Sequence, residues 1–320
     1  MKHTTNLLGI LAACIIAVSA CGTAPPELPP DSPPAMSQLL ASDEADDVLN
    51  RLTTYAWDDD GAAAATRFTW IGADAHATEA GAASQANQAA AVLAEFLLTH
   101  HNNLTAIKSG FLGSSKVTAA QLNPLLIRSY ATALAPYIKD LAGGQDAAFQ
   151  APRTQVSDDP SALRGLLSVL VADPEAGRLI AESVQSAAEM YEDYAASAAS
   201  DSDESVTDLR AAGSLLGAVA GAARQTGAEI PVSTGGEALN DMAVRTASTL
   251  LRSDPNPGEV GKYVRGGKLM PPAEVEREFS KNAMRTYFLD LQEYLSDRGF
   301  GDGLSAFNNA FRTSSGEDVQ

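Results

Sequence analysis

The chain has few of the residues from which catalytic and metal sites are built, and few cations. Its 320 residues include two cysteines and four histidines, and aromatic residues make up 6%. Two cysteines exclude a disulfide framework as the basis of the fold. Lysine and arginine number 22 against 40 acidic residues, which excludes nucleic acid as the main partner because a phosphate backbone needs clustered cations. The alanine-rich composition with few aromatics favours helices over sheets.

Residues 1–20 have the organisation of a secretory signal. Lys2 and His3 give a positive start, and an uncharged apolar stretch runs from Leu7 to Val18. This stretch is shorter than the ~20 residues that a membrane-spanning helix needs. We therefore predict a cleaved signal peptide over residues 1–20 rather than a permanent transmembrane helix.

The signal ends in the pattern of a bacterial lipobox, Val18, Ser19, Ala20 and Cys21. Small residues admit the chain to a signal peptidase, and the thiol at the first mature position takes a diacylglycerol. Two or three fatty acyl chains together hold a protein firmly to a bilayer. We therefore expect an acylated Cys21 on the extracytoplasmic side of the cell membrane. The alternative is an ordinary signal cleaved elsewhere, with Cys21 a free thiol.

A proline-rich segment follows the predicted lipidated cysteine. Residues 21–36 contain six prolines, and proline fixes φ and removes an amide donor. We predict an extended linker over these residues, reaching roughly 45 Å at about 3.1 Å per residue. A docking ligand for an aromatic groove is the alternative. A helical domain is expected over residues 37–312, with a polar tail over 313–320.

The body has the periodicity and punctuation of helices. Apolar residues recur every three to four positions, and no run alternates apolar and polar residues as a strand does. Asn123, Asp159 and Asp173 each precede a proline, which combines a cap residue with proline in the first turn. We predict an all-α fold, a single bundle-like domain of about nine helices.

Four segments carry more specific predictions. Residues 143–157 are expected to form a loop, with a division into two packed halves nearby as the alternative. One long helix is expected over residues 274–298. The glycines four apart in the helix over residues 206–227 indicate close packing inside a soluble domain rather than a membrane dimer face. The loop over residues 261–272 contains basic residues, which could contact anionic lipid. We expect a solvated loop instead, with the lipid contact as the alternative.

No arrangement of residues in the sequence indicates catalysis. The three histidines that remain after cleavage are His76, His100 and His101, and the last two point about 100° apart on a helix. The run Asp58–Asp60 is more typical of a helix cap than of a cation site. No Gly-x-Ser-x-Gly elbow occurs. We predict a non-enzymatic protein without catalytic residues, a metal site or a cofactor.

Five short motifs carry a resemblance to a known group of proteins. They are Trp57–Gly61, Phe68–Ile71, Leu122–Pro124, Asp173–Gly177 and Lys268–Pro272. With these motifs, residues 43–295 resemble the helical region of actinobacterial, chiefly mycobacterial, proteins described as uncharacterised or as containing a TPR repeat region. No tetratricopeptide consensus is visible in this chain. Some of these relatives are linked with type VII secretion and carry an additional N-terminal helical hairpin, where this chain has a lipobox.

These predictions together point to an exported lipoprotein of the cell envelope. Our leading hypothesis is that its helical domain binds a protein or a wall polymer there. One alternative is a carrier of apolar ligands, which needs a large apolar cavity. Another is a hydrolase or transferase assembled from distant residues, which needs a cleft where Asp, Glu, Ser or His converge with perturbed pKa values.

Overall fold

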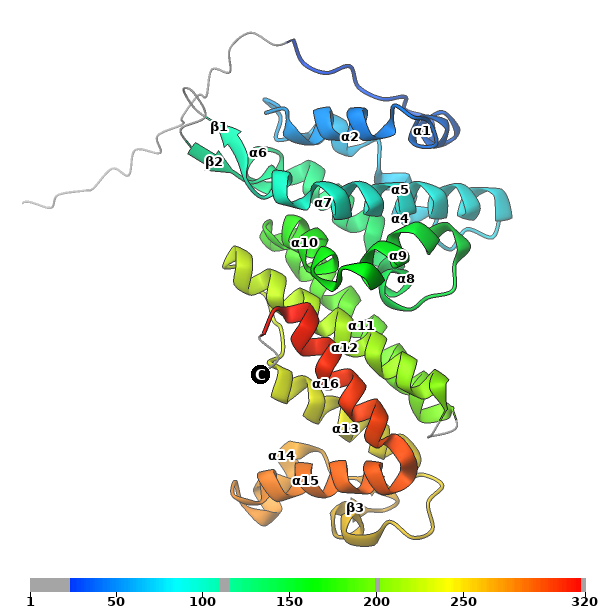
Figure 1. The fold of residues 1–320 in the computed structure, drawn as a ribbon, viewed down its shortest axis with the longest axis vertical. Helices are drawn as coiled ribbons and strands as arrows, with labels where there is room; N and C mark the ends of the chain where they lie inside the picture. Colours follow the sequence, from blue (N-terminus) through cyan, green and yellow to red (C-terminus); the bar gives the residue numbers. More distant parts are fainter. Residues whose placement is uncertain (1–23, 110–114, 199–201, 318–320) are drawn as a thin grey trace, which may run out of the picture.

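Helices stacked along one long axis make up nearly all of the protein (Figure 1). The computed structural model describes residues 24–109, 115–198 and 202–317. Over these residues the fold is all-α, and fourteen α-helices have five residues or more. The predicted fold class is confirmed, whereas the predicted count of about nine helices is wrong, because prolines and local breaks divide several helices. The predicted signal and the lipobox, Val18–Cys21, lie outside the described residues.

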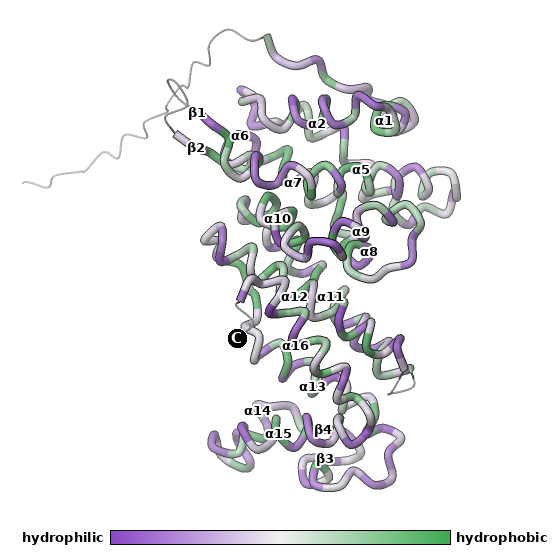
Figure 2. Tube along the Cα trace, in the orientation of Figure 1, coloured by the Kyte–Doolittle hydropathy of each residue, from purple (hydrophilic) through white to green (hydrophobic). Residues whose placement is uncertain are grey.

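The first half of the molecule is arranged around the long helix α5. Helices α1, α2, α4, α7 and α10 all contact it, and Figure 2 shows α10 as largely apolar. The α-helices of this half are α1 (Pro33–Leu40), α2 (Ala45–Thr54), α3 (Ala62–Ala65), α4 (Thr69–Ala73), α5 (Ala80–Leu104), α6 (Ala119–Leu122), α7 (Pro124–Leu134), α8 (Ile138–Ala142), α9 (Gln150–Asp158) and α10 (Pro160–Val171).

Helix α1 begins inside the segment predicted as an extended linker. Pro33 and Pro34 occupy its first turn, where the missing amide hydrogens would have no partner in a helix. Pro29 is buried, and Met36 is fully buried against the core. The extended linker predicted through residue 36 therefore ends before Pro33, and the helical body begins there rather than at residue 37.

The loop predicted over residues 143–157 is largely helical. A 3-10 turn over Ala147–Phe149 leads into α9. Pro152 lies in the first turn of α9, and Phe149 and Val156 are buried. One continuous cluster of buried apolar side chains then extends from Met36 to Phe311, so this segment does not divide the core into two halves.

Helix α12 (Asp203–Thr226) is the centre of the second half. It packs between α11 (Pro174–Ser197) and α16 (Gly301–Ser315), and α13 (Gly235–Leu250) lies beside α11. A side chain on any of three α12 glycines would overlap the backbone of α16, so the two helices touch directly. The glycines are Gly213, Gly217 and Gly221. The prediction of a buried, closely packed helix is confirmed.

The far end of the molecule carries α14 (Pro272–Phe279) and α15 (Ala283–Leu295). These replace the single helix predicted over residues 274–298, because Ser280 has a φ of +87° that no α-helix tolerates. A 3-10 helix over Gly258–Tyr263 precedes a hairpin of β3 (Val264–Arg265) and β4 (Lys268–Leu269).

A second hairpin joins α5 to α6 in the first half. Its strands β1 (Ile107–Ser109) and β2 (Ser115–Val117) pair antiparallel. The sequence predicted no strand, and strands of two or three residues are too short to show an alternating pattern. None of the helices in the described part of the chain has the length and hydropathy that crossing a membrane requires.

The basic loop near β3 and β4 is largely neutralised by its surroundings. Lys262 Nζ lies 2.7 Å from Asp290 Oδ2, and Arg265 Nη2 lies 2.8 Å from Glu278 Oε1. Two of its three cations are therefore paired with carboxylates of the same end. This pairing favours the solvated hairpin over a lipid contact.

Candidate functional site

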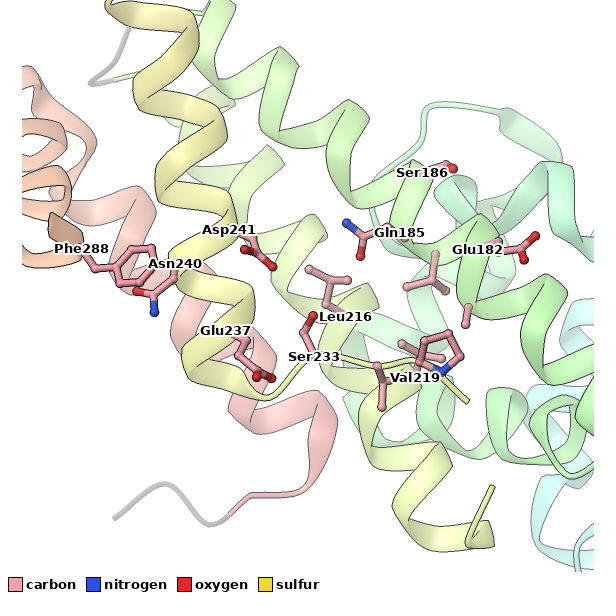
Figure 3. Close-up of a pocket in the computed structure, with 14 residues that line it drawn as sticks. Glu182, Gln185, Ser186, Leu216, Val219, Ser233, Glu237, Asn240, Asp241 and Phe288 are labelled. Atoms are coloured by element: carbon pink, nitrogen blue, oxygen red, sulfur yellow. The ribbon is translucent and has the colours of Figure 1, made fainter. Parts of the chain in front are cut away.

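Two adjoining cavities open between α11 and α13. Their volumes are about 840 and 720 Å³, within the range of ordinary ligand pockets. Gln185, Leu216, Ser233 and Asp241 line both of them. We therefore treat them as one continuous site and call it the α11–α13 groove. Figure 3 shows the residues that line the first cavity.

The connection between α12 and α13 forms one wall of the groove. Gly227 ends α12 in the left-handed conformation with φ +69°, which glycine adopts without strain. The chain then runs extended, and Pro231, Val232 and Ser233 line the first cavity. Thr234 starts α13 with a capping box, in which the Thr234 amide donates a hydrogen bond to the Glu237 carboxylate.

The floor of the first cavity is apolar. Ala181 and Val184 come from α11, and Leu216 and Val219 come from α12. All four side chains are buried, and Leu216 retains 7% exposure on the floor. An apolar side chain placed in this cavity would therefore leave water for a hydrocarbon surface, which is favourable in proportion to the area buried.

The rim of the same cavity is acidic. Glu182, Glu237 and Asp241 line it, and no lysine or arginine does. Among the described residues, Asp241 has neither an ion pair nor a side-chain hydrogen bond. Partial desolvation by the groove walls raises the pKa of Asp241, and the nearby charge of Glu237 adds to this effect, whereas Arg245 opposes it. The cavity thus offers one unpaired carboxylate above an apolar floor.

In the second cavity, the partly exposed Arg245 of α13 contacts two glutamates of α11. Arg245 Nε lies 3.1 Å from Glu192 Oε2, and Arg245 Nη2 lies 2.7 Å from Glu189 Oε1. Glu192 is 4% exposed, and burial raises its pKa to about 8 although Arg245 opposes the shift. Arg245 is therefore held by two glutamate side chains, whereas Asp241 has no ion pair among the described residues.

None of the histidines considered in the sequence lines either cavity of the groove. His76 lines a third cavity beside Pro136, which shares Glu182 and Ser186 with the first. His100 Nε2 lies 2.7 Å from Asp46 Oδ1, and His101 Nδ1 lies 2.8 Å from the Leu98 carbonyl. In the described ranges, no three His, Cys, Asp or Glu side chains are placed to share a metal ion.

The aspartate run before α3 caps the chain locally. The Ala63 amide donates to Asp59 Oδ2 at 2.9 Å, and the Gly61 amide donates to Asp59 Oδ1 at 3.2 Å. The prediction that this run caps a helix start is thus confirmed for Asp59.

The sequence did not single out the residues of the groove. Gln185, Glu189 and Glu192 are spaced to share one face of a helix, as are Asp241 and Arg245. This spacing is a signal for two polar faces, but it does not show that the faces oppose each other. Their juxtaposition depends on the antiparallel return of the chain through α12.

Comparison of the chain with protein-family models, curated proteins and solved structures finds no match. The resemblance to actinobacterial helical proteins therefore stays a prediction, and the function has to be argued from the site.

Proposed function

We propose that the protein is a lipid-anchored, non-enzymatic component of the cell envelope that binds a partner through the α11–α13 groove. The anchor and its extracytoplasmic location rest on the lipobox pattern ending at Cys21. The binding role rests on one observation, an open groove with an apolar floor and the unpaired carboxylate of Asp241. Such a combination of an apolar surface with a few polar groups is typical of binding sites.

The acidic rim favours this function over a carrier of apolar ligands. A lipid tail lying in the groove would remove water from Glu182, Glu237 and Asp241 without replacing the lost hydrogen bonds, which is costly. The interior of the helical body is filled by a continuous apolar cluster. A partner with polar groups of its own fits the groove better.

Site-specific photocrosslinking in intact cells tests the proposal. A photoreactive amino acid at Ser233, which lines both cavities, should give discrete adducts with envelope components. The same probe at Glu95, exposed on α5 away from the groove, is the matched control. The absence of adducts at Ser233, or an identical set from both positions, would contradict the proposal.

A second candidate function is an acid–base hydrolase of the cell wall. The observation that favours it is the presence of two carboxyl groups with raised pKa values, Glu192 and Asp241, in one groove. Incubation of the purified protein with cell-wall material tests it. Release of soluble fragments that is lost in Glu192→Gln would support this activity, and no release from the unmodified protein would exclude it for that material.

A further inference from the structure

We infer that the α11–α13 groove takes a cationic, amphipathic peptide segment of another envelope protein, with lysine or arginine at Asp241 and apolar side chains on Leu216 and Val219. The inference rests on the proposed binding function and specifies the chemistry of the partner. It follows from the shape, the charge and the floor of the groove.

The length of the groove favours a peptide over a small ligand. Two cavities of about 840 and 720 Å³ adjoin at Gln185, Leu216, Ser233 and Asp241. A single drug-sized molecule fills one pocket of this size. A segment several residues long can occupy both cavities. Asp241 lines both of them, so it can pair with a cation placed in either.

The charge of the groove selects a cationic segment. The first cavity is lined by three acidic residues and no cation, and the second by four acidic residues, Asp241 among them, with Arg245 and Arg252. Glu182 pairs with Arg178 and Glu237 caps α13, which leaves Asp241 as the carboxylate of the first cavity that a partner can pair with. The whole chain has a net charge of −18. Opposite charge speeds the approach of a partner and like charge rejects one. An anionic wall polymer would be repelled, whereas a lysine or arginine would gain an ion pair with the unpaired Asp241.

The floor requires apolar side chains next to the cation. Leu216 and Val219 present hydrocarbon beneath the carboxylates, and Val232 adds to the wall from the connecting segment. A simple polyamine would satisfy the charge but would leave this surface in water. An amphipathic segment satisfies both, because neighbouring residues carry the charge and the apolar side chains.

Fluorescence anisotropy on the full chain, purified in non-ionic detergent, tests the inference. The probes are a labelled octapeptide of alternating lysine and leucine, one of alternating glutamate and leucine, and spermine as a competitor. We expect the lysine peptide to bind, more weakly as salt increases, and the glutamate peptide not to bind. Spermine should displace the lysine peptide only at concentrations well above the peptide's own Kd.

Charge changes at Asp241 locate the site. Asp241 is exposed on α13, so its variants should retain the fold, which circular dichroism checks. Asp241→Lys should weaken binding of the lysine peptide at least about tenfold, since like charge replaces opposite charge. Asp241→Asn should weaken it less, and Glu95→Gln, which removes one charge from α5, should leave it unchanged.

Several results would overturn the inference. They are no binding of the lysine peptide, equal binding of the glutamate peptide, displacement by spermine at the peptide's own Kd, and unchanged affinity in both Asp241 variants. Crosslinked adducts at Ser233 that persist in Asp241→Lys would overturn the cationic partner while leaving the envelope-binding function in place. Loss of those adducts in Asp241→Lys but not in Glu95→Gln would support both.

Discussion

At the scale of single residues, buried polar groups define where the helices meet. Asn123 is fully buried, and its Nδ2 donates to the carbonyls of Thr53 at 3.0 Å and Tyr55 at 2.7 Å. Its Oδ1 accepts from the Trp57 amide at 3.2 Å. The sequence predicted Asn123 as a helix cap, but its side chain makes no capping hydrogen bond. It instead fixes the chain that follows α2, a role that local spacing does not show.

Replacement of Asn123 should therefore destabilise the whole protein. Asn123→Ala removes three hydrogen bonds and leaves buried backbone groups without partners, so we expect a loss of about 2–4 kcal/mol in the free energy of unfolding. Urea denaturation measures it. Asn102→Ala, at an exposed position of α5, is the control and should change stability by less than about 0.5 kcal/mol. A variant at position 123 as stable as the unmodified chain would show that these bonds contribute little.

Glu192 makes stability depend on pH. Its pKa is about 8 in the folded protein, against 4.5 for an ordinary glutamate. Between these values the folded state binds the proton more tightly than the unfolded state, so stability falls as pH rises from 4.5 to 8. Glu192→Gln has no ionisable group at this position, so its stability should not show this decrease with pH.

We therefore expect Glu192→Gln to gain stability relative to the unmodified chain on going from pH 5 to pH 8. The relative gain should be at least about 1.4 kcal/mol, the equivalent of one pKa unit. Denaturation at the two pH values measures it. Glu189→Gln, which changes the more exposed partner of Arg245, should show little pH-dependent gain, and an equal gain in both variants would assign the effect to Arg245 instead.

At the scale of elements, direct helix contact explains the second half of the fold. Gly213, Gly217 and Gly221 let α16 lie against α12 without side chains between them. Two arginines complete the contact at the end of α16, because Arg164 donates to the Ser314 carbonyl at 3.1 Å and Arg224 donates to the Ser315 carbonyl at 2.8 Å. Cations are favourable at a helix C-terminus.

A larger side chain at the centre of this contact should weaken it. In Gly217→Val the added atoms would overlap the backbone of Phe311, and we expect a loss of about 1–3 kcal/mol or more from overpacking. Thermal unfolding measures it. Gly236→Ala, in α13 where nothing lies within 4 Å of the added carbon, is the control and should gain up to about 1 kcal/mol. A Gly217→Val chain with unchanged stability would mean that α16 is displaced without cost.

The sequence predicts helices correctly where a local signal marks their ends. It predicts them poorly where packing against other helices determines whether a helix forms or breaks. The Asp-Pro pairs at Asp159 and Asp173 begin α10 and α11, and both aspartates accept capping hydrogen bonds. Ser280 carries no signal for a break, because its left-handed backbone is not preferred by serine. Residues 150–158 lack a clear apolar stripe, and α9 is held by contacts with α5, α8 and α10.

At the scale of the whole molecule, the groove is a product of tertiary arrangement. Its residues come mainly from α11, α12, α13 and the connecting segment, with Phe288 from α15 and Pro272 from α14, and no local pattern joins them. The sequence identified the class of fold and the central packing of α12 because these follow from periodicity and small residues. It did not identify the site, since opposing faces are set only when distant helices pack.

The proposed anchor gives a prediction for the whole molecule. Cys21→Ala should move the protein from the membrane fraction to the soluble fraction, because the thiol that would take the lipid is lost. Cys14→Ala, within the predicted signal, is the matched control and should leave the protein in the membrane fraction. Fractionation followed by immunoblotting measures both, and a Cys21→Ala protein still bound to membranes would contradict lipid anchoring.

Burial of Pro29 has a consequence for how such a molecule would stand. With a lipid on Cys21, the free chain after it would end before Leu28, which packs against the core, giving a tether of roughly 20 Å at about 3.1 Å per residue. Under the proposed anchoring, a tether this short would turn the α1 and α2 end toward the lipid, and the β3–β4 end, at the opposite end of the stack, would be outermost (Figure 1). A partner anchored in the same leaflet would then have to extend along the side of the helical stack to reach the groove. A partner attached to the cell wall would reach the groove from the side.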